Sequence, residues 1–428
     1  MYTKGIMRIY FSGIGGVGIG PLAQIALGAG YEVVGSDRES SLTTEALTRR
    51  GVTVYIGEQT GDFLRAQHAR EPFDYFVYTA ALPDDHAELT AAHELGIMCL
   101  KRDGLLARII DEKDLQMIAV AGTHGKTTTT GLLVWVMKQL GIPISYSVGS
   151  TFAFGPSGEY APGSTYFVYE CDEYDRNFLH YTPELSLVTS VDYDHPDTYP
   201  TLESYQQAFA SFMDQSSTVF LWQKDYDVLG EPSVSSDLKV LDDATHLEHI
   251  HLPGLHVRQN AFLVERAIRQ LFPDVAYSAI VSALNSFPGV ARRMERLADN
   301  LYTDYGHHPA EIQATLQLAR ELSGHVVLVY QPHQNVRQHE IADEYTPAVF
   351  ADAEAVYWLP TYLSRENPDL EVLSPQQLSK QLDPAKLHVA DLDDELWQAI
   401  ADARHAGKFV LAMGAGSIDS WLRSHLKV

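Results

Sequence analysis

The chain has 428 residues and 45% of them are hydrophobic, so we expect roughly three globular domains, each with its own core. Its formal net charge of −25 at pH 7 argues against nucleic acid or an anionic membrane surface as a partner, because both would repel it. No basic-then-apolar leader opens the sequence, and no apolar run approaches the ~20 residues that span a bilayer, which predicts a cytoplasmic protein.

The first part of the chain alternates strand and helix signals, which predicts βαβ units and a mostly parallel sheet. In chain order we expect a strand at Met7–Ser12, a tight turn at Gly13–Gly18, a helix at Pro21–Ala29, a strand at Tyr31–Val34 with Asp37 just past its end, and a strand at Phe73–Tyr78 that leads into Thr79. A charged cluster at residues 111–114 interrupts this pattern, so we place the end of the first domain at residue 112.

The alternation resumes in two further stretches, which predicts an α/β chain with three domains. The second stretch should contain strands at Leu115–Val120, Tyr166–Tyr169 and Leu185–Val191, with a helix that ends near Leu140. The third should contain strands at Val326–Tyr330, Ala355–Leu359 and Phe409–Met413. We therefore predict a second domain at residues 113–296 and a third at residues 297–428.

A candidate phosphate-binding loop follows the first strand of the second domain. The run Gly122–Thr128, GTHGKTT, stands between a predicted strand and a predicted helix, where backbone N–H groups and the positive helix end face phosphates. Lys126 should neutralise the β and γ oxygens of ATP, and the Thr127 hydroxyl should ligate magnesium. The common pattern has a glycine five residues before Gly125, where this chain has Val120, so the loop is a shortened variant.

Two acidic clusters end neighbouring strands of the same predicted domain. One runs from Tyr169 to Asp175 and the other from Val191 to Asp197. The carboxyl ends of parallel strands meet at one edge of a sheet, so both clusters should lie beside the phosphate loop. Mg²⁺ keeps several waters and takes one or two protein carboxylates, which suits this edge, whereas the alternative is a solvated acidic loop.

The glycine-rich turn near the N-terminus is a second phosphate-binding candidate. Gly13-x-Gly15-x-x-Gly18, together with Asp37 after the next strand, matches the dinucleotide-binding pattern. Taken alone it would indicate an NAD-dependent oxidoreductase. The same turn could hold the diphosphate of another nucleotide, and an oxidoreductase does not need a second loop that binds ATP.

Three short runs in the last predicted domain follow strands, where α/β sheets bind ligands. They are Asp304–Pro309, which contains two adjacent histidines, Gln331–Arg337, and Gly414–Asp419. The adjacent Arg292 and Arg293 could clamp a phosphate, although a solvated basic pair is the alternative.

Together these motifs resemble those of the Mur ligases, the ATP-dependent amino-acid ligases of peptidoglycan synthesis. The resemblance runs nearly from end to end and keeps the family order: GIGGVG, GTHGKTTTT, DEYD, DYDHPD, GLHVRQN, RRMER, DYGHHPAEI, QPH and GAGSID. The combination of GTHGKTTTT with DYGHHPAEI is specific, whereas GIGGVG alone is weak. Within the family the sequence is most similar to the branch that joins L-alanine to UDP-N-acetylmuramate.

The resemblance implies a ligase whose Rossmann-like first domain binds the UDP-sugar, whose central domain binds ATP and Mg²⁺, and whose C-terminal domain closes the site and binds the amino acid. The sugar carboxylate would attack ATP to form an acyl phosphate, which the amine of the amino acid then attacks. A monomer or homodimer is expected.

The site residues implied by the resemblance fall into five groups. For the UDP-sugar they are Gly13, Gly15, Gly16, Gly18, Ser36, Asp37 and Thr79; for ATP, Gly122, Thr123, Gly125, Lys126, Thr127, Thr128, Asn260, Arg293 and Asp304; for the metal, Thr127, Glu170 and His195; for the amino acid, His333 and Arg337; and for catalysis, Lys126, His308 and His333.

Several residues depart from the pattern of the L-alanine branch and keep other functions open. Gln334 and Asn335 replace the usual arginine and aromatic residue after QPH. Tyr174 and Arg176 replace small residues and favour a related ligase that attaches a murein tripeptide. A protein that hydrolyses ATP without ligation is a further alternative, beside the NAD-dependent oxidoreductase.

Overall fold

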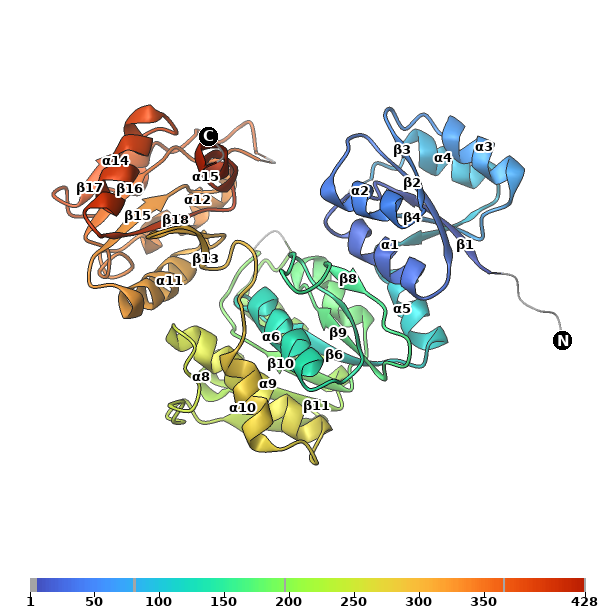
Figure 1. Ribbon diagram of the computed structural model, residues 1–428, viewed down its shortest axis with the longest axis horizontal. Helices are drawn as coiled ribbons and strands as arrows, with labels where there is room; N and C mark the ends of the chain where they lie inside the picture. The colour runs from blue at the N-terminus through green and yellow to red at the C-terminus, as the bar shows by residue number, and fades with distance from the viewer. Residues whose placement is uncertain (1–5, 80–81, 196–197, 365, 427–428) are drawn as a thin grey trace. The chain divides into compact units, whose positions relative to one another are not determined.

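The computed structural model describes residues 6–79, 82–195, 198–364 and 366–426. Within these ranges the chain forms two compact units, one made of residues up to His246 with Ala261–Phe287, the other of Leu247–Asn260 with Pro288 onward. The first unit contains two sheets and the second contains one, which gives three α/β domains (Figure 1). No helix among the described residues is long and apolar enough to cross a membrane.

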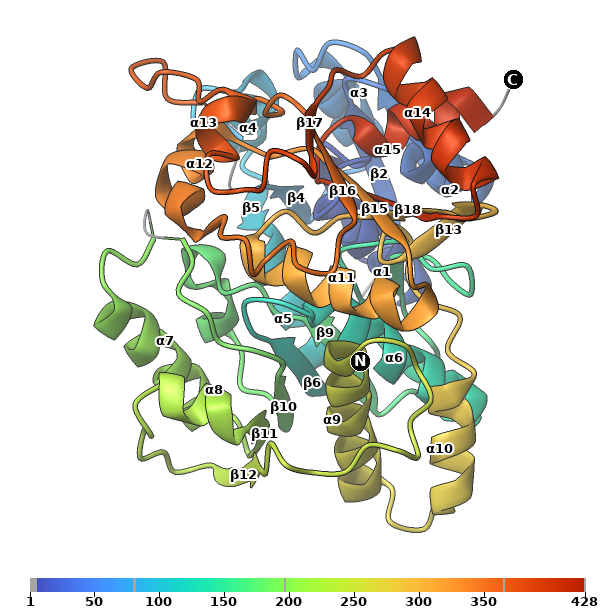
Figure 2. The same ribbon diagram turned by 90° about the vertical axis from the view of Figure 1, so that its left-hand side faces the viewer.

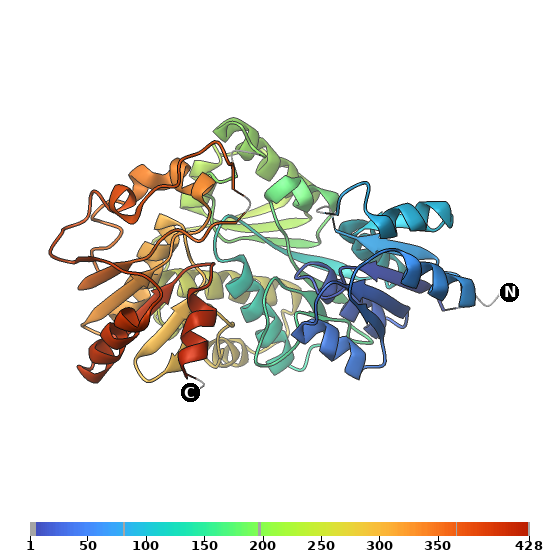
Figure 3. The same cartoon turned by 90° about the horizontal axis from the view of Figure 1, so that it is seen from above.

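The N-terminal domain is a parallel sheet with helices on both faces. Over the described residues it has five strands in the order β3-β2-β1-β4-β5. Its elements are β1 (Arg8–Ser12), α1 (Ile19–Gly28), β2 (Glu32–Asp37), α2 (Leu42–Arg49), β3 (Thr53–Ile56), α3 (Asp62–Arg70), β4 (Tyr75–Tyr78), α4 (Ala87–Glu94), β5 (Met98–Lys101) and α5 (Arg102–Glu112). Successive side chains of the central strand β1 enter different cores, Phe11 with Leu22 on one face and Tyr10 with Leu64 on the other. Both faces are therefore buried, and Figure 3 shows the blue helices on either side of this sheet.

The middle domain is a larger sheet whose strands are parallel except at one edge. The described residues contribute seven strands in the order β12-β11-β10-β6-β9-β7-β8, and only the β7–β8 pair is antiparallel. Its elements are β6 (Gln116–Ala121), α6 (Lys126–Gln139), β7 (Ile144–Ser147), β8 (Gly158–Glu159), β9 (Tyr166–Glu170), the 3₁₀ segment η1 (Tyr174–His180), β10 (Leu185–Val188), α7 (Leu202–Gln215), β11 (Thr218–Trp222), α8 (Gln223–Val228), β12 (Asp237–Leu241), α9 (Leu255–Leu271) and α10 (Tyr277–Asn285). Figure 2 shows β10, β11 and β12 in succession along this sheet.

Strand register brings three loops of the middle sheet to one edge. Val120 of β6 pairs with Glu170, the last residue of β9, and Ala121 pairs with Val188, the last residue of β10. The segments that follow these strands, including the run that begins at Gly122, therefore leave the sheet side by side. This confirms that the acidic strand ends lie at the same edge as the phosphate loop.

The C-terminal domain repeats the layered arrangement. In the described part of the chain six strands run in the order β13-β14-β18-β15-β16-β17, parallel except for the β13–β14 pair. Its elements are β13 (Glu295–Ala298), β14 (Leu301–Asp304), α11 (Pro309–Leu322), β15 (Val326–Tyr330), α12 (Asn335–Ile341), the 3₁₀ segment η2 (Ala342–Glu344), β16 (Ala355–Trp358), α13 (Pro375–Leu378), β17 (Leu387–Val389), α14 (Asp394–His405), β18 (Phe409–Met413) and α15 (Ile418–Leu426). Strands β15 and β18 are wholly buried and have the predicted bounds.

Helix α1 packs closely against the middle sheet within the first unit. A Cβ added at Gly158 of β8 would lie 2.3 Å from the carbonyl oxygen of Pro21, and one added at Gly28 would lie 3.2 Å from Tyr160 Cβ. Backbone meets backbone here because glycine carries no side chain. The contact fixes the N-terminal glycine-rich turn with respect to the phosphate loop.

Two predicted boundaries can be compared with the elements directly. The first domain was expected to end at residue 112, which is also the last residue of α5. The second boundary, between residues 296 and 297, falls inside strand β13. The assignment of a separate role to each domain stays a prediction.

Candidate functional site

The loop between β6 and α6 has a backbone that only glycine allows at two positions. Gly122 has φ of +130° and Gly125 has φ of +83°. A Cβ at Gly122 would also lie 2.5 Å from Thr189 Oγ1 and 2.7 Å from the Ser190 carbonyl oxygen. The Thr123 N–H donates to that same carbonyl at 2.9 Å, which ties the loop to the end of β10. The loop is thereby held in one shape, with α6 beginning directly after Gly125.

Lys126 begins α6 and forms a buried ion pair. Its Nζ lies 2.7 Å from Glu173 Oε2 and donates to the Gly122 carbonyl oxygen at 2.7 Å. The Glu173 side chain is only 1% exposed. Burial lowers the pKa of Lys126, but the nearby carboxylates of Glu173 and Asp172 outweigh burial, so this pKa is raised and the ammonium stays charged. Burial raises the pKa of Glu173, because Lys126 offsets only part of the desolvation.

Thr127 and Glu170 offer hard oxygen ligands beside the lysine. The Thr127 hydroxyl donates to Glu170 Oε1 at 2.8 Å, and the Gly149 N–H donates to Glu170 Oε2 at 2.9 Å. A hydroxyl and one carboxylate fit Mg²⁺, which retains waters in its remaining positions. Within the described residues, no group of three or more His, Cys, Asp or Glu side chains could enclose a metal.

His195, the third predicted metal ligand, lies beside Glu173 instead. Its Nε2 is 3.7 Å from Glu173 Oε1, and its ring packs edge-on against Tyr174 with centroids 5.1 Å apart. In the described ranges no hydrogen bond or ion pair joins it to Glu170 or Thr127. Pro196 and Asp197 of the predicted second acidic cluster lie outside the described residues.

Asp37, the last residue of β2, holds the glycine-rich turn of the first domain in place. The Gly15 N–H donates to Asp37 Oδ2 at 2.7 Å, and the Gly16 N–H donates to the Gly13 carbonyl oxygen at 3.0 Å. A Cβ at Gly15 would lie 2.9 Å from the same carboxylate oxygen. Asp37 ends strand β2 rather than following it, and its carboxylate is engaged by the turn.

Ser36, another predicted UDP-sugar residue, is fully buried. Its hydroxyl donates to Glu88 Oε1 at 2.6 Å, and Glu88 also accepts from Tyr10 and Ser12 hydroxyls at 2.6 Å each. Three hydroxyls thus satisfy a carboxylate that is 1% exposed. The predicted residue Thr79 directly follows β4, at the same edge of the sheet.

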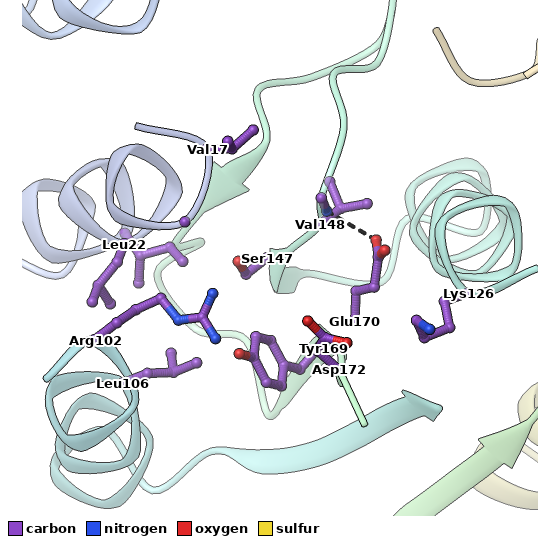
Figure 4. A pocket seen from close by; sticks show the side chains of 13 residues that line it. Val17, Leu22, Arg102, Leu106, Lys126, Ser147, Val148, Tyr169, Glu170 and Asp172 are labelled. Atoms are coloured by element: carbon purple, nitrogen blue, oxygen red, sulfur yellow. Dashed lines mark hydrogen bonds between the residues drawn. The ribbon is translucent and has the colours of Figure 1, made fainter. Parts of the chain in front are cut away.

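A pocket of about 180 Å³ connects the glycine-rich turn with the phosphate loop. Val17 and Arg102 lie on its N-terminal-domain side, and Lys126 and Glu170 lie on the other (Figure 4). The ends of β1, β5, β6 and β9 therefore supply one cavity within the first unit. It is the arrangement expected for a ligand that extends from one phosphate-binding loop to the other.

In the C-terminal unit, Asp304 and Arg293 lie in neighbouring segments. Asp304 ends β14 and accepts the Gly306 N–H at 2.7 Å; burial raises the pKa of this carboxyl group. The Arg293 guanidinium lies 3.7 Å from Glu311 Oε1. Asn260, the predicted adenine-contacting residue, is 5% exposed and lies in α9.

His307, the histidine after Gly306, is half-buried beside the predicted amino-acid-binding residues. His307 Nε2 lies 2.6 Å from Arg337 NH1, and its ring meets His333 edge-on at a centroid distance of 5.5 Å. Burial lowers the pKa of His307 to about 4, and Arg337 adds to this effect. A neutral His307 can accept a hydrogen bond from the guanidinium through Nε2 while Nδ1 donates to the Tyr305 carbonyl oxygen at 3.3 Å.

His308, which we predicted as a catalytic base, caps helix α11. Its Nδ1 accepts the Ala310 N–H at 3.3 Å, and its Nε2 lies 3.8 Å from Glu344 Oε2. Of the two adjacent histidines, it is His307, not His308, that the structure brings together with His333 and Arg337.

The segment after His333 is held by a carboxylate. Gln334 has φ of +60°, and the N–H groups of Asn335 and Val336 donate to the two carboxylate oxygens of Glu366 at 3.1 and 3.3 Å. The start of α12, where the sequence departs from the family pattern, is thus occupied by an acidic side chain of the same chain.

The run Gly414–Asp419 contacts two other segments of the C-terminal domain, the one that contains Arg292 and the one that begins at Gln331. The Ile418 N–H donates to Gln331 Oε1 at 3.0 Å, and Arg292 NH2 donates to the Gly414 carbonyl oxygen at 3.0 Å. Arg292 is therefore engaged within the domain rather than being a solvated basic residue.

Sequence reasoning missed three residues at these sites. Glu173 lies in the predicted acidic cluster, but nothing in the sequence assigns it a role different from that of its neighbours. His307 lies next to His308, which was named as the catalytic candidate. Arg102 had one usable signal, its position directly after strand β5 at the ligand-binding edge of a parallel sheet.

Comparison with known proteins gives consistent matches along the chain. Three family models cover it in order: "Mur ligase family, catalytic domain" at residues 8–114, "Mur ligase middle domain" at 120–241, and "Mur ligase, glutamate ligase domain" at 292–416. A UDP-N-acetylmuramate–L-alanine ligase of Nocardioides sp. is 34% identical over 430 residues, which cover 96% of this chain and 94% of the relative.

Two solved structures share the fold. The UDP-N-acetylmuramate–alanine ligase MurC of Thermotoga maritima has a TM-score of 0.76 at 24% identity, over 98% of both chains. A murein peptide ligase of Psychrobacter arcticus has a TM-score of 0.63 at 22% identity, also over 98% of both chains.

Proposed function

Because the chain belongs to the Mur ligase family, we propose that it joins L-alanine to the lactyl carboxylate of UDP-N-acetylmuramate while ATP is converted to ADP and phosphate. The observation that carries this proposal is the full-length similarity, at 34% identity, to a ligase named for that reaction. The pocket between two phosphate-binding loops supports it, since such a ligase must hold a sugar nucleotide and ATP together. An oxidoreductase would not need the second loop.

We assign one task to each domain. Residues 1–112 bind the UDP-sugar through the turn at Gly13–Gly18, residues 113–296 bind ATP, and residues 297–428 bind the amino acid and close the site. The fixed shape of the loop at Gly122–Lys126 supports the second assignment, because a preformed loop of N–H groups suits phosphate.

The first chemical step is attack of the sugar carboxylate on the γ-phosphate of ATP. Lys126 keeps its positive charge at neutral pH, as its raised pKa indicates, and it stabilises the negative charge that spreads over the phosphoryl oxygens. Glu173 fixes the direction of the ammonium group through the 2.7 Å ion pair. Thr127 and Glu170 would hold Mg²⁺, which when bound neutralises phosphate charge.

The second step is attack of the alanine amine on the acyl phosphate. Phosphate leaves, and the amine loses a proton to a nearby base. We place the amino acid next to His333 and Arg337, where the guanidinium would bind its carboxylate. The half-buried, neutral His307 orients Arg337 through the 2.6 Å contact, and His333 is our choice for the base because the Nδ1 of His308 already caps a helix.

The test is phosphate release from ATP with each substrate omitted in turn. Phosphate should appear only when both UDP-N-acetylmuramate and L-alanine are present, and the product should gain the mass of one alanyl residue. Equal phosphate release without the sugar would leave only an ATP hydrolase, and the proposal would then be wrong.

A murein tripeptide is the competing acceptor. Gln334 and Asn335 replace the usual arginine and aromatic residue after QPH, and Tyr174 and Arg176 replace small residues. These departures are the observations that favour this alternative. Mass spectrometry of a reaction that contains equal amounts of L-alanine, L-serine, glycine and the tripeptide decides between them. A dominant tripeptide product would overturn L-alanine as the acceptor.

A further inference from the structure

Arg102 places a guanidinium in the pocket between the two phosphate-binding loops. It is the first residue of α5, and its side chain extends from the N-terminal domain into the cavity (Figure 4). Among the described residues that line this pocket, Lys126 is the other cation, and it lies on the opposite side. The two positive groups are therefore separated across the cavity.

The guanidinium is anchored at one nitrogen and available at the others. Arg102 Nε donates to Asp103 Oδ1 at 3.0 Å. The same oxygen accepts from the Tyr181 hydroxyl at 3.2 Å and from the Tyr169 hydroxyl at 3.5 Å, so it is itself fixed by the middle domain. No hydrogen bond from either terminal nitrogen of Arg102 to another described residue is formed. A guanidinium with one fixed edge and one open edge is suited to a bidentate anion.

Gly18 makes room for that open edge. Its φ is −91°, which any residue can adopt, so backbone freedom does not explain the glycine. A Cβ at this position would instead lie 3.0 Å from Arg102 NH1. The last glycine of the Gly13–Gly18 turn thus allows the guanidinium to approach the backbone of the turn.

We propose that Arg102 binds the diphosphate of the sugar nucleotide and joins the glycine-rich turn as part of its binding site. This inference rests on the proposed function for the identity of the ligand. The alternative anion, the carboxylate of the sugar, must reach the phosphate loop, where Glu170 and Asp172 line the pocket and Lys126 is the nearby cation. Arg102 lies at the turn, where the nucleotide half of the ligand is expected.

Direct binding without ATP tests this assignment. The dissociation constants of UDP, UDP-N-acetylglucosamine and UDP-N-acetylmuramate are measured by calorimetry for the wild type and for Arg102→Met. We expect all three ligands to bind about 10- to 100-fold more weakly to the variant, because each carries the diphosphate. Weaker binding of UDP-N-acetylmuramate alone would assign Arg102 to the carboxylate, and unchanged binding of UDP would remove it from the site.

Three further variants separate recognition from folding. Arg108→Met removes a guanidinium from the exposed side of the same helix, where Arg108 lies over the Tyr75 ring, and it should leave UDP binding unchanged. Arg102→Lys keeps the charge but loses the paired N–H donors of the guanidinium, so it should bind UDP with an affinity between those of the wild type and Arg102→Met. Gly18→Ala keeps the guanidinium but displaces it, and it should weaken UDP binding several-fold; wild-type affinity in Gly18→Ala would contradict the proposal.

The UDP titrations test the role of Arg102 independently of whether the enzyme turns over. If the wild type binds UDP tightly but releases no phosphate with alanine, the proposed reaction fails while the role of Arg102 is still decided by the UDP titrations. If phosphate release requires both substrates but Arg102→Met binds UDP normally, the reaction stands and this inference fails.

Discussion

Replacing Lys126 by methionine should destabilise the protein as well as abolish turnover, because it leaves the Glu173 carboxylate buried without a cation. The ion pair is 2.7 Å long, and the carboxylate is 1% exposed. Removing one partner of such a pair costs about 3–5 kcal/mol. The Lys126 side chain is 15% exposed, so we expect the lower end, about 3 kcal/mol.

The reverse replacement should cost less. In Glu173→Gln the ammonium of Lys126 keeps the Gly122 carbonyl oxygen at 2.7 Å and the Thr123 carbonyl oxygen at 3.3 Å as acceptors. We expect a loss of about 1–2 kcal/mol, the usual value for a hydrogen bond to a charged group. The double variant removes both charges and should be more stable than Lys126→Met alone, although it remains inactive.

Urea unfolding followed by tryptophan fluorescence gives the free energies for the four proteins of this cycle. A coupling energy below about 0.5 kcal/mol, as found for independent sites, would refute the reasoning. The pH dependence gives a second check. Without Lys126, the pKa of Glu173 in the folded protein rises further above its unfolded value, so the folded state binds the extra proton. The penalty in Lys126→Met should therefore be full at pH 8 and shrink as the pH falls toward 5.

Three other changes test separate parts of the site. Gly122→Ala should reduce kcat/KM for ATP by more than about tenfold while UDP still binds, because the new methyl group meets Thr189 and the backbone strongly prefers glycine; steady-state kinetics and calorimetry check this, and an unchanged kcat/KM for ATP would contradict it. Glu170→Gln should raise the Mg²⁺ concentration for half-maximal activity by about tenfold; an unchanged Mg²⁺ titration would exclude Glu170 from the metal site. His307→Asn should lose less stability than the wild type between pH 7 and pH 5, since the lowered pKa of about 4 means that the unfolded chain binds a proton that the folded chain does not; the effect in the wild type over this pH range is about 2 kcal/mol, and parallel thermal-unfolding curves would disprove it.

The strands that were predicted well share one property, which is burial on both faces. Strands β15 and β18 are continuous apolar runs and have the expected bounds, since every residue in them enters a core. Edge strands such as β12 and β17 were not predicted, because they are partly exposed and carry no apolar run. Strand β2 was predicted too short: Gly35–Asp37 look like a turn, yet β3 pairs with all three residues and β1 pairs with Gly35 and Ser36.

The candidate phosphate loop could be proposed from the sequence because the features of such a loop lie in residues that are adjacent in the sequence. Backbone conformation, the first turn of a helix and one lysine are all specified within Gly122–Thr128. Arg102 is different. Nothing in its neighbours shows that it meets Gly18, because that contact depends on how α5 and the glycine-rich turn are brought together by the parallel sheet.

The acidic run after β9 shows why sequence alone could not divide the site into roles. The sequence does not distinguish the carboxylates of Glu170, Asp172 and Glu173, and any of them could face a metal. Strand β9 ends at Glu170, which still follows the sheet register and reaches Thr127. The chain then turns, and Glu173 points inward to Lys126. One carboxylate therefore lies on the partly exposed side proposed for the metal and another holds Lys126, and only the turn between them distinguishes the two. A variant that exchanged their roles would need a new backbone path and not merely a new side chain.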